Sequence, residues 1–413
     1  MKILEDSEVV RLKGILQKNA SEGKYVISDL ILHQNGQTHQ FVDLVMEGGG
    51  TLGIALVGYI YALEQANIRF LGIGGSSVGA IVSLLLASIG SREEEKGAIL
   101  AEMISNMDMS AFIDGGIFSS ALSRLLGSGK AGQKKLKVVL LALGASRTLV
   151  KKLGLNPGHQ FLEWLTGHLV EHGIHTQEDV QRRLDYIPEG LVHREYGREF
   201  PRPAADLKLV AADLTTNSKV VFPEMAPLYW EIPGTVNPAL FARASMSIPG
   251  FFQPMEVTGV SKIVNSNEKW NDLCSFGGRI PDRITFSDGG LLSNFPISLF
   301  HRPRVPNSPT LGVRLGSCSR VVREIDSIGR YAGNLFSSLR QHNDYDFIFQ
   351  NPDYRRLIAY IPTEEHNWLN FFMSDDEKLT LFKKGMVTAC KFLETFNWKE
   401  YKEIRRVQMA QNI

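Results

Sequence analysis

The sequence predicts an α/β fold, in which crossover helices connect the strands of a mainly parallel central sheet. A short apolar strand, a glycine-rich turn and an apolar helix follow one another twice within residues 41–89, a pattern typical of parallel strands joined by crossover helices. The chain has 413 residues, 44% of them hydrophobic, which is enough for a large core. We therefore expect one elaborated α/β domain instead of several average ones.

The two strand–turn–helix units come first in this prediction. Residues 41–46 (FVDLVM) form a strand, the glycine-rich residues 47–53 a turn, and residues 54–66 a helix, because apolar residues recur there at helical spacing. Residues 68–73 form the second strand, and glycine-rich residues 74–79 lead into an apolar helix. Later strands are predicted at 207–212, 284–287, 310–314 and 357–361, and a last helix at 375–396.

We divide the chain into an N-terminal appendage (1–40), a single domain (41–400) and a C-terminal tail (401–413). The appendage contains a short helix near residues 8–18 and a hairpin at Asn35-Gly36, a dipeptide typical of two-residue β turns. Residues 91–205 contain no convincing strand. We expect them to form a mostly helical insertion or cap.

The overall charge and the cysteines exclude several classes of protein. The balance of 45 basic against 44 acidic residues, a net charge of +1, argues against a nucleic-acid-binding protein. Cys274, Cys318 and Cys390 are too few and too scattered for a disulfide framework or a zinc site, and we expect neither metal nor cofactor. The N-terminus lacks the segments of a signal peptide, and no run reaches the ~18 apolar residues of a membrane span. We expect a cytoplasmic protein, with any membrane contact being peripheral.

The GSSVG sequence at residues 75–79 matches G-x-S-x-G and lies between a predicted strand and a predicted helix. A nucleophile elbow has this arrangement, because its sharp turn holds the serine in a strained conformation with the hydroxyl exposed. Gly75 and Gly79 let the strand and the helix approach closely. Because the helix N-terminus favours a negative oxygen beside Ser77, we favour a nucleophilic serine over a purely structural glycine turn.

A second glycine-rich turn, residues 48–53 (GGGTLG), formally matches the dinucleotide-binding pattern G-x-G-x-x-G. That fingerprint requires an acidic residue about 20 positions further on, and residues 67–75 (NIRFLGIGG) contain none. The strand there ends instead in the candidate serine. Because the amides of a glycine loop bind an oxyanion as well as a phosphate, we interpret Gly49 and Gly50 as oxyanion donors for Ser77.

A serine nucleophile needs a base, and the sequence offers two kinds. His301 follows a proline-bounded segment and is a candidate base for a Ser-His-Asp triad. Asp288 directly follows the predicted strand 284–287, at a carboxyl end where α/β sheets place active sites. Gly289 and Gly290 after it would let a substrate approach. Taken alone, an Asp-Gly pair is more often a turn than a base.

The elements EGGGTLG, GSSVG and DGG, in this order and context, resemble the patatin-like phospholipases. Further similar stretches are ARAS (242–245), IPGFFQP (248–254), ADLT (212–215), GHQFLEW (158–164) and the last long helix. The resemblance covers about residues 41–400 and leaves residues 1–40 unexplained. It implies a three-layer α/β/α fold with a mainly parallel sheet, a helical cap and C-terminal helices.

By this resemblance the chain is a serine lipid acyl hydrolase that cleaves phospholipid or related acyl esters. Ser77 would be the nucleophile and Asp288 its base, in a dyad without histidine. The oxyanion hole would consist of Gly48, Gly49 and Gly50. Position 52 departs from the family, which usually has Arg or Lys there. Leu52 removes a cation near the site but no member of the dyad.

The expected partner is a lipid substrate or a phospholipid membrane surface. Residues 115–162 carry eight Lys or Arg and no Asp or Glu, around the apolar run 138–143 (VVLLAL). Such a segment suits docking on anionic lipid, and an ordinary buried helix or an oligomer interface explains it equally well. A lid, a homo-oligomer or an activating partner would restrain the enzyme. Two other functions stay open: an esterase with a histidine triad, and a catalytically weak lipid- or nucleotide-binding regulatory module.

Overall fold

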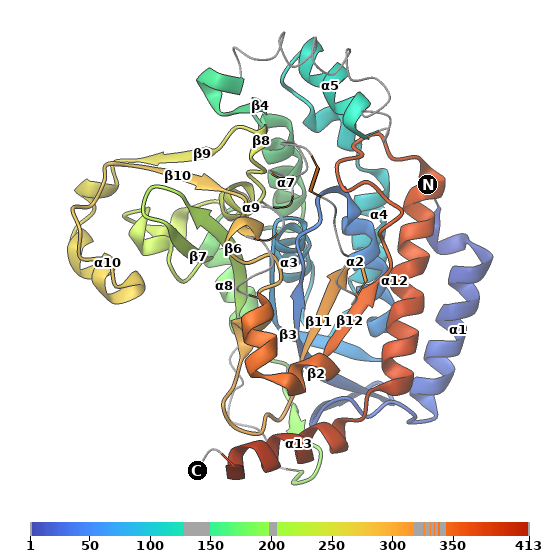
Figure 1. Cartoon of the computed structure of the whole chain (residues 1–413). Coiled ribbons are helices and arrows are strands. Elements are labelled where there is room, and N and C mark those ends of the chain that lie inside the picture. The colour runs from blue at the N-terminus through green and yellow to red at the C-terminus, as the bar shows by residue number, and fades with distance from the viewer. Residues whose placement is uncertain are drawn as a thin grey trace.

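The computed structural model describes residues 2–127, 149–197, 205–317 and 344–411, together with 325–326, 331, 334 and 338. Ten strands of these residues form one mixed sheet of order β12-β11-β2-β3-β6-β10-β9, with β1, β5 and β7 paired at its sides (Figure 1). The strands are β1 (Leu30–Gln34), β2 (Gln37–Met46), β3 (Ile68–Ser76), β5 (Val192–His193), β6 (Leu207–Asp213), β7 (Ser218–Phe222), β9 (Met255–Thr258), β10 (Arg283–Ser287), β11 (Thr310–Leu315) and β12 (Ile358–Ile361). A separate two-stranded sheet pairs β4 (Gly154–Asn156) with β8 (Gly250–Phe252).

Helices flank the large sheet. They are α1 (Ser7–Ser21), α2 (Gly53–Gln65), α3 (Val78–Ser88), α4 (Gly97–Asn106), α5 (Ile117–Gly127), α7 (His159–Glu171), α8 (Gln177–Asp185), α9 (Ala239–Ser245), α10 (Ser266–Cys274), α12 (Asp375–Thr395) and α13 (Trp398–Gln411). Both predicted strand–turn–helix units are present, because β2 leads through the first glycine turn into α2, and β3 leads through the second into α3.

The middle of the sheet is parallel, which confirms the predicted fold class. β12 pairs with β11, β11 with β2, β2 with β3, and β3 with β6 in parallel ladders. All four later strands that the sequence predicts are present, as β6, β10, β11 and β12. β10 nevertheless runs antiparallel to β6. The direction of that strand decides which residues reach the site.

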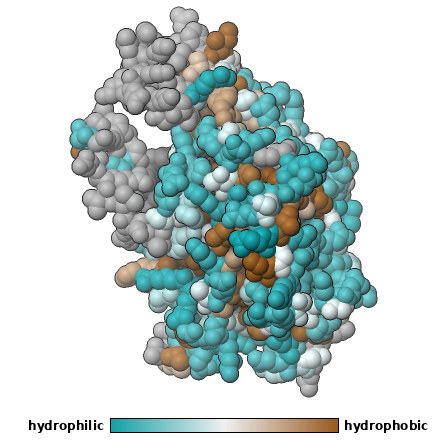
Figure 2. Space-filling view, turned by 90° about the vertical axis from the view of Figure 1, so that its right-hand side faces the viewer, coloured by the Kyte–Doolittle hydropathy of each residue, from teal (hydrophilic) through white to brown (hydrophobic). Residues whose placement is uncertain are grey.

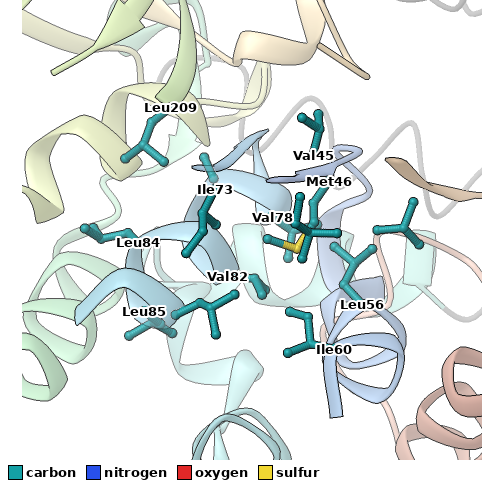
Figure 3. Close-up of a cluster of buried hydrophobic side chains, with 14 of the residues drawn as sticks. Val45, Met46, Leu56, Ile60, Ile73, Val78, Val82, Leu84, Leu85 and Leu209 are labelled. Carbon is teal, nitrogen blue, oxygen red and sulfur yellow. The ribbon is translucent and has the colours of Figure 1, made fainter. Parts of the chain in front are cut away.

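α2 is apolar on all sides, and every one of its residues is buried. Such a helix packs on both sides: it meets α12 on one side and the interior of the fold on the other. Figure 3 shows part of this interior, where Leu56 and Ile60 of α2 lie near Met46 and Val82. A Cβ on Gly58 of α2 would collide with the backbone of α12, so this glycine allows the two helices to pack closely.

Residues 1–40 pack into the fold. α1 lies against α2 and α12, side by side with α12 in Figure 1. The predicted hairpin is confirmed, because β1 pairs with β2 across Asn35 and Gly36, whose φ angles of 52° and 74° suit a two-residue turn. This hairpin crosses residue 40, and α13 crosses residue 400. The division of the chain into domains stays a prediction.

The described part of residues 91–205 is mostly helical, as predicted, with α4, α5, α7 and α8 and only the short strands β4 and β5. The apolar run 138–143 and most of the basic stretch lie outside the described residues. The face in Figure 2 is largely hydrophilic, with hydrophobic residues interspersed. Among the helices that the structure describes, none combines the length and the apolar character needed to cross a bilayer. The cytoplasmic location stays a prediction.

Candidate active site

Ser77 lies at the turn between β3 and α3 with a strained backbone. Its φ of 52° and ψ of −123° are rare for residues other than glycine. The turn is tight because Gly75 and Gly79 both approach the Met46 carbonyl of β2, and a Cβ on Gly75 would lie 2.7 Å from that oxygen. The elbow therefore depends on two glycines and on the strand beside them.

A hydrogen-bonded chain ties this elbow to β6. The Ser77 N–H donates to Ser245 Oγ at 2.8 Å, and Ser245 Oγ donates to the Val210 carbonyl at 2.6 Å. The first amides of a helix have no carbonyl partner one turn earlier. The Val78 amide, directly after Ser77, is thus a further donor that the sequence analysis missed. Its position after a nucleophilic serine is the signal that could have found it.

The glycine loop after β2 packs against the serine turn. A Cβ on Gly48 would lie 3.0 Å from Ser77 Cβ. The Gly48 N–H donates to the Asn294 carbonyl at 2.9 Å and is therefore occupied. Gly50 has a φ of 58°, and within the described ranges the amides of Gly49 and Gly50 donate to no protein group. Of these two residues, Gly50 also lines the apolar pocket that includes Ser77.

Asp288 comes to the same place through an antiparallel strand. The last residue of β10 pairs with Ala212 of β6, two positions beyond Val210, which pairs with the last residue of β3. The chain that follows β10 therefore runs next to the serine turn, and a Cβ on Gly289 would lie 2.7 Å from Ser76 Oγ. From the sequence, Asp288 is predicted directly after a strand, at a carboxyl end where α/β sheets place active sites. It is the antiparallel register that brings its loop beside Ser76 and Ser77.

Hydrogen bonds orient the Asp288 loop. The buried Asp288 donates its N–H to the Ser247 carbonyl at 2.9 Å, and its Oδ1 accepts from the Gly290 N–H at 2.8 Å. Arg243 in turn holds Ser247, because its Nη1 donates to Ser247 Oγ at 2.7 Å. Arg243 therefore acts on the Asp288 loop through Ser247, whose carbonyl accepts the Asp288 N–H.

His301 lies at the amino ends of the parallel strands, opposite the end at which Ser77 lies. Its Nδ1 is 2.8 Å from the Tyr354 hydroxyl, and both residues precede the amino ends of strands, β11 and β12 respectively. Burial and the charge of Arg405 lower the pKa of His301. Ser77, by contrast, follows the carboxyl end of β3. The structure therefore does not bring His301 to Ser77.

An apolar pocket includes Ser77 in its wall. Gly50 and Thr51 of the glycine loop line it, and the helical insertion contributes three aromatic side chains. Among these, Phe112 packs edge to face on Phe161 and Trp164, with ring centroids 5.5 and 5.7 Å apart. Nowhere in the described ranges do three or more His, Cys, Asp or Glu side chains form a group that could hold a metal ion.

An α/β sheet with a strained serine at a strand–helix turn, beside an apolar pocket, is the arrangement that a lipid acyl hydrolase requires. The family model described as patatin-like phospholipase matches residues 44–301. The chain belongs to the patatin-like phospholipase family.

Three individual proteins illustrate these similarities. The chain is 26% identical over 363 residues to the uncharacterized protein YqhO of Bacillus subtilis, covering 87% of this chain and all of that protein. It is 52% identical over 46 residues to lysophospholipase nte1 of Aspergillus niger, covering 11% of this chain and 3% of that protein. The crystal structure of VipD from Legionella pneumophila superposes with a TM-score of 0.42 at 16% identity, covering 90% of this chain and 70% of that one.

Proposed function

We propose that Ser77 and Asp288 form a catalytic dyad that hydrolyses acyl esters of phospholipids or related lipids. The observation that carries this proposal is the strained Ser77 in the wall of an apolar pocket, beside the loop that begins at Asp288. A pocket lined mostly by apolar groups, with the Ser77 hydroxyl in its wall, suits an acyl chain whose ester carbonyl stops at that hydroxyl. Membership of a phospholipase family supports the substrate class.

In the proposed reaction Asp288 accepts the Ser77 hydroxyl proton while Oγ attacks the ester carbonyl carbon. The carbonyl oxygen becomes negative and accepts hydrogen bonds from the amides of Gly49, Gly50 and Val78. Collapse of this intermediate breaks the ester bond, and the leaving lysophospholipid or alcohol takes the proton from Asp288. Water then attacks the acyl-serine, with Asp288 as base, and releases the fatty acid while the proton returns to Ser77.

We assign Gly48 a different part from the other two glycines. The sequence predicts its amide as an oxyanion donor, but this amide donates to the Asn294 carbonyl and has only one proton to give. Gly48 instead provides space, because a Cβ there would lie 2.6 Å from Asn294 Oδ1 and 3.0 Å from Ser77 Cβ. The oxyanion site in this proposal consists of Gly49, Gly50 and Val78.

Fluorophosphonate labelling and lipid-product analysis test the dyad. Ser77→Ala should abolish labelling and fatty-acid release, and Asp288→Asn should lower kcat by about 10³-fold. His301→Ala is the matched control and should keep full activity, since His301 lies at the amino ends of the parallel strands. Loss of activity in His301→Ala alone would replace the dyad by a triad. A folded wild type whose Ser77 is never labelled, with or without lipid, would favour a regulatory binding module.

We also infer that the helical insertion docks on anionic lipid. Val150 and Leu153 are 74% and 60% exposed and flank Lys151 and Lys152. Apolar side chains of this kind enter the interfacial region of a bilayer, and each nearby lysine contributes about 1 kcal/mol on an anionic surface. The exposed apolar side chains and the lysines together therefore favour a phospholipid surface as the partner.

Sedimentation with phosphatidylserine-containing liposomes tests this docking. The double substitution Val150→Asp/Leu153→Asp should weaken binding at least tenfold. Ile232→Asp is the control, because Ile232 is equally exposed, at 63%, and lies outside the insertion. Equal binding of all three proteins would reject the docking surface. Restraint by a homo-oligomer or an activating partner stays a prediction, which activity measured against enzyme concentration would test.

A further inference from the structure

A buried carboxylate lies directly under the glycine loop. Glu47 precedes Gly48, and its Oε1 accepts from Arg314 Nε and Nη2 at 3.2 and 2.8 Å and from Asn294 Nδ2 at 3.1 Å. Its Oε2 accepts from the Leu315 N–H at 2.7 Å. Four donors on one buried carboxylate hold this side chain in a single position.

Arg314 is the positive charge of this cluster. Burial lowers the pKa of Arg314, but the charge of Glu47 and its hydrogen bonds outweigh burial and raise it above its ordinary value. The guanidinium also lies over the rings of Phe295 and Tyr345, at 5.2 and 5.5 Å. In the described structure, Arg314 therefore provides a positive charge close to the glycine loop.

Asn294 connects the glycine loop to the Asp288 loop. Besides contacting Glu47, its Nδ2 donates to the Gly48 carbonyl at 3.1 Å, and its own carbonyl accepts from the Gly48 N–H at 2.9 Å. Asp344 fixes the chain on both sides of Asn294, accepting from Ser293 Oγ and from the Phe295 N–H, each at 2.7 Å. Asn294 follows Asp288 by six residues. The cluster thus sets the position of one loop relative to the other.

We propose that Glu47, Arg314 and Asn294 are positioning residues that hold the Gly49 and Gly50 amides toward the reacting carbonyl. Arg314 has a second part in this proposal, which rests on the proposed function. It neutralises the Glu47 carboxylate. An unpaired negative charge on Glu47 would repel the oxyanion that forms at the amides of Gly49 and Gly50, two and three residues further along the chain. A charge left unpaired in a buried site acts strongly on a charge that develops nearby, because little solvent screens it.

Charge pairing between Arg314 and Glu47 predicts an order of activities that a purely structural role would not produce. Arg314→Gln leaves Glu47 charged and unpaired, and should lower kcat about 10²-fold while KM changes little, because the loss is confined to the transition state. Glu47→Gln/Arg314→Gln removes both charges and should recover kcat to within about tenfold of wild type. Arg314→Lys, which keeps the charge but not the bidentate geometry, should lie between these two.

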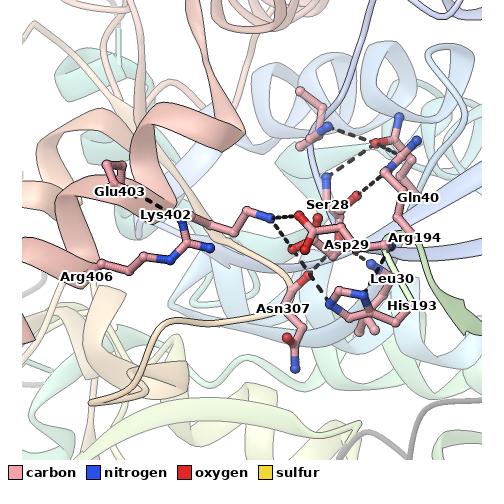
Figure 4. A network of polar contacts seen from close by, with 12 residues as sticks. Ser28, Asp29, Leu30, Gln40, His193, Arg194, Asn307, Lys402, Glu403 and Arg406 are labelled. Atoms are coloured by element: carbon pink, nitrogen blue, oxygen red, sulfur yellow. Dashed lines mark hydrogen bonds and ion pairs between the residues drawn. The ribbon is translucent and has the colours of Figure 1, made fainter. Parts of the chain in front are cut away.

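The assay is hydrolysis of p-nitrophenyl butyrate by the full-length chain, with urea unfolding of every variant. Lys402→Gln is the matched control. It breaks the 2.7 Å ion pair between Lys402 of α13 and Asp29 (Figure 4), which is as buried as the 2.8 Å Arg314–Glu47 pair. Lys402→Gln should lose stability and keep the wild-type kcat and KM.

Each outcome decides for or against the cluster. A double variant no more active than Arg314→Gln, or Arg314→Gln with the wild-type kcat, overturns the proposal. Should Arg314→Gln not fold, Arg314→Lys and Asn294→Ala carry the test, and the wild-type kcat in both would overturn it. The proposed function fails differently, because Ser77 in the folded wild type would then be neither labelled nor active.

Discussion

Substitution of Gly75 by alanine tests how closely the serine turn is built onto the neighbouring strand. The new Cβ would lie 2.6 Å from the carbonyl carbon of Gly79 and 2.7 Å from the Met46 carbonyl oxygen. All of these are backbone atoms, so no flexible side chain can move aside. The backbone of Gly75 has no positive φ, and the effect of the substitution is therefore one of space alone.

The size of the effect follows from these distances. Real Cβ contacts are essentially never shorter than 3.0 Å, so Gly75 must move about 0.3 Å away from β2 and about 0.4 Å away from Gly79 of α3, and about 0.7–0.8 Å to reach ordinary contact. Overpacking of this kind costs about 1–3 kcal/mol of stability. Ser77 is two residues away and would move relative to the glycine loop, and a misplacement approaching 1 Å costs about 10²-fold in rate.

Urea unfolding and p-nitrophenyl butyrate hydrolysis measure the two effects. Gly14→Ala is the control, because Gly14 lies in α1 with nothing within 4 Å of its Cβ position. That substitution should stabilise the protein by a few tenths of a kcal/mol up to about 1 kcal/mol and leave activity unchanged. Gly75→Ala with the wild-type unfolding midpoint and kcat would refute the argument from close approach.

Two further predictions concern the pocket and a buried carboxylate. Trp164→Ala enlarges the apolar pocket and should shift the optimum of kcat/KM toward p-nitrophenyl esters with longer acyl chains. Each additional methylene that the pocket accommodates should contribute about 1 kcal/mol or more to transition-state binding. An unchanged chain-length profile would show that the indole does not limit the acyl chain. Burial raises the pKa of Asp43 from 3.8 to about 6, against the lowering by Arg302 and by the Gly72 N–H. The folded state therefore binds the Asp43 proton more tightly than the unfolded state does. The contribution of this proton to the free energy of unfolding is fully present below pH 3.8, and about 2–3 kcal/mol of it is lost as the pH rises from there through 6. Urea unfolding between pH 4.5 and 7.5 should show a smaller fall of the unfolding free energy in Asp43→Asn than in the wild type. An equal fall in both proteins would contradict this prediction.

The local pattern of the sequence was enough to determine the two strand–turn–helix units and the β1–β2 hairpin. The Asn35-Gly36 dipeptide specifies a backbone turn through neighbouring residues only, and Gly75 and Gly79 indicate the serine turn by their spacing around Ser77. The sequence also predicted the strained Ser77, because G-x-S-x-G between a strand and a helix is typical of such a turn, although the turn itself packs on the Met46 carbonyl of β2. Apolar runs likewise indicate strands and buried helices, because burial shows in composition.

The tertiary structure alone decided which distant residues meet. Hydrophobic patterns report that a strand is buried but neither its direction nor its neighbour, so the antiparallel β10 that brings the Asp288 loop beside Ser76 could not be predicted. For the same reason the sequence did not show that Asn294 occupies the Gly48 amide, or that Arg314 pairs with Glu47 across 267 positions. These contacts are long-range pairings, which no local spacing encodes.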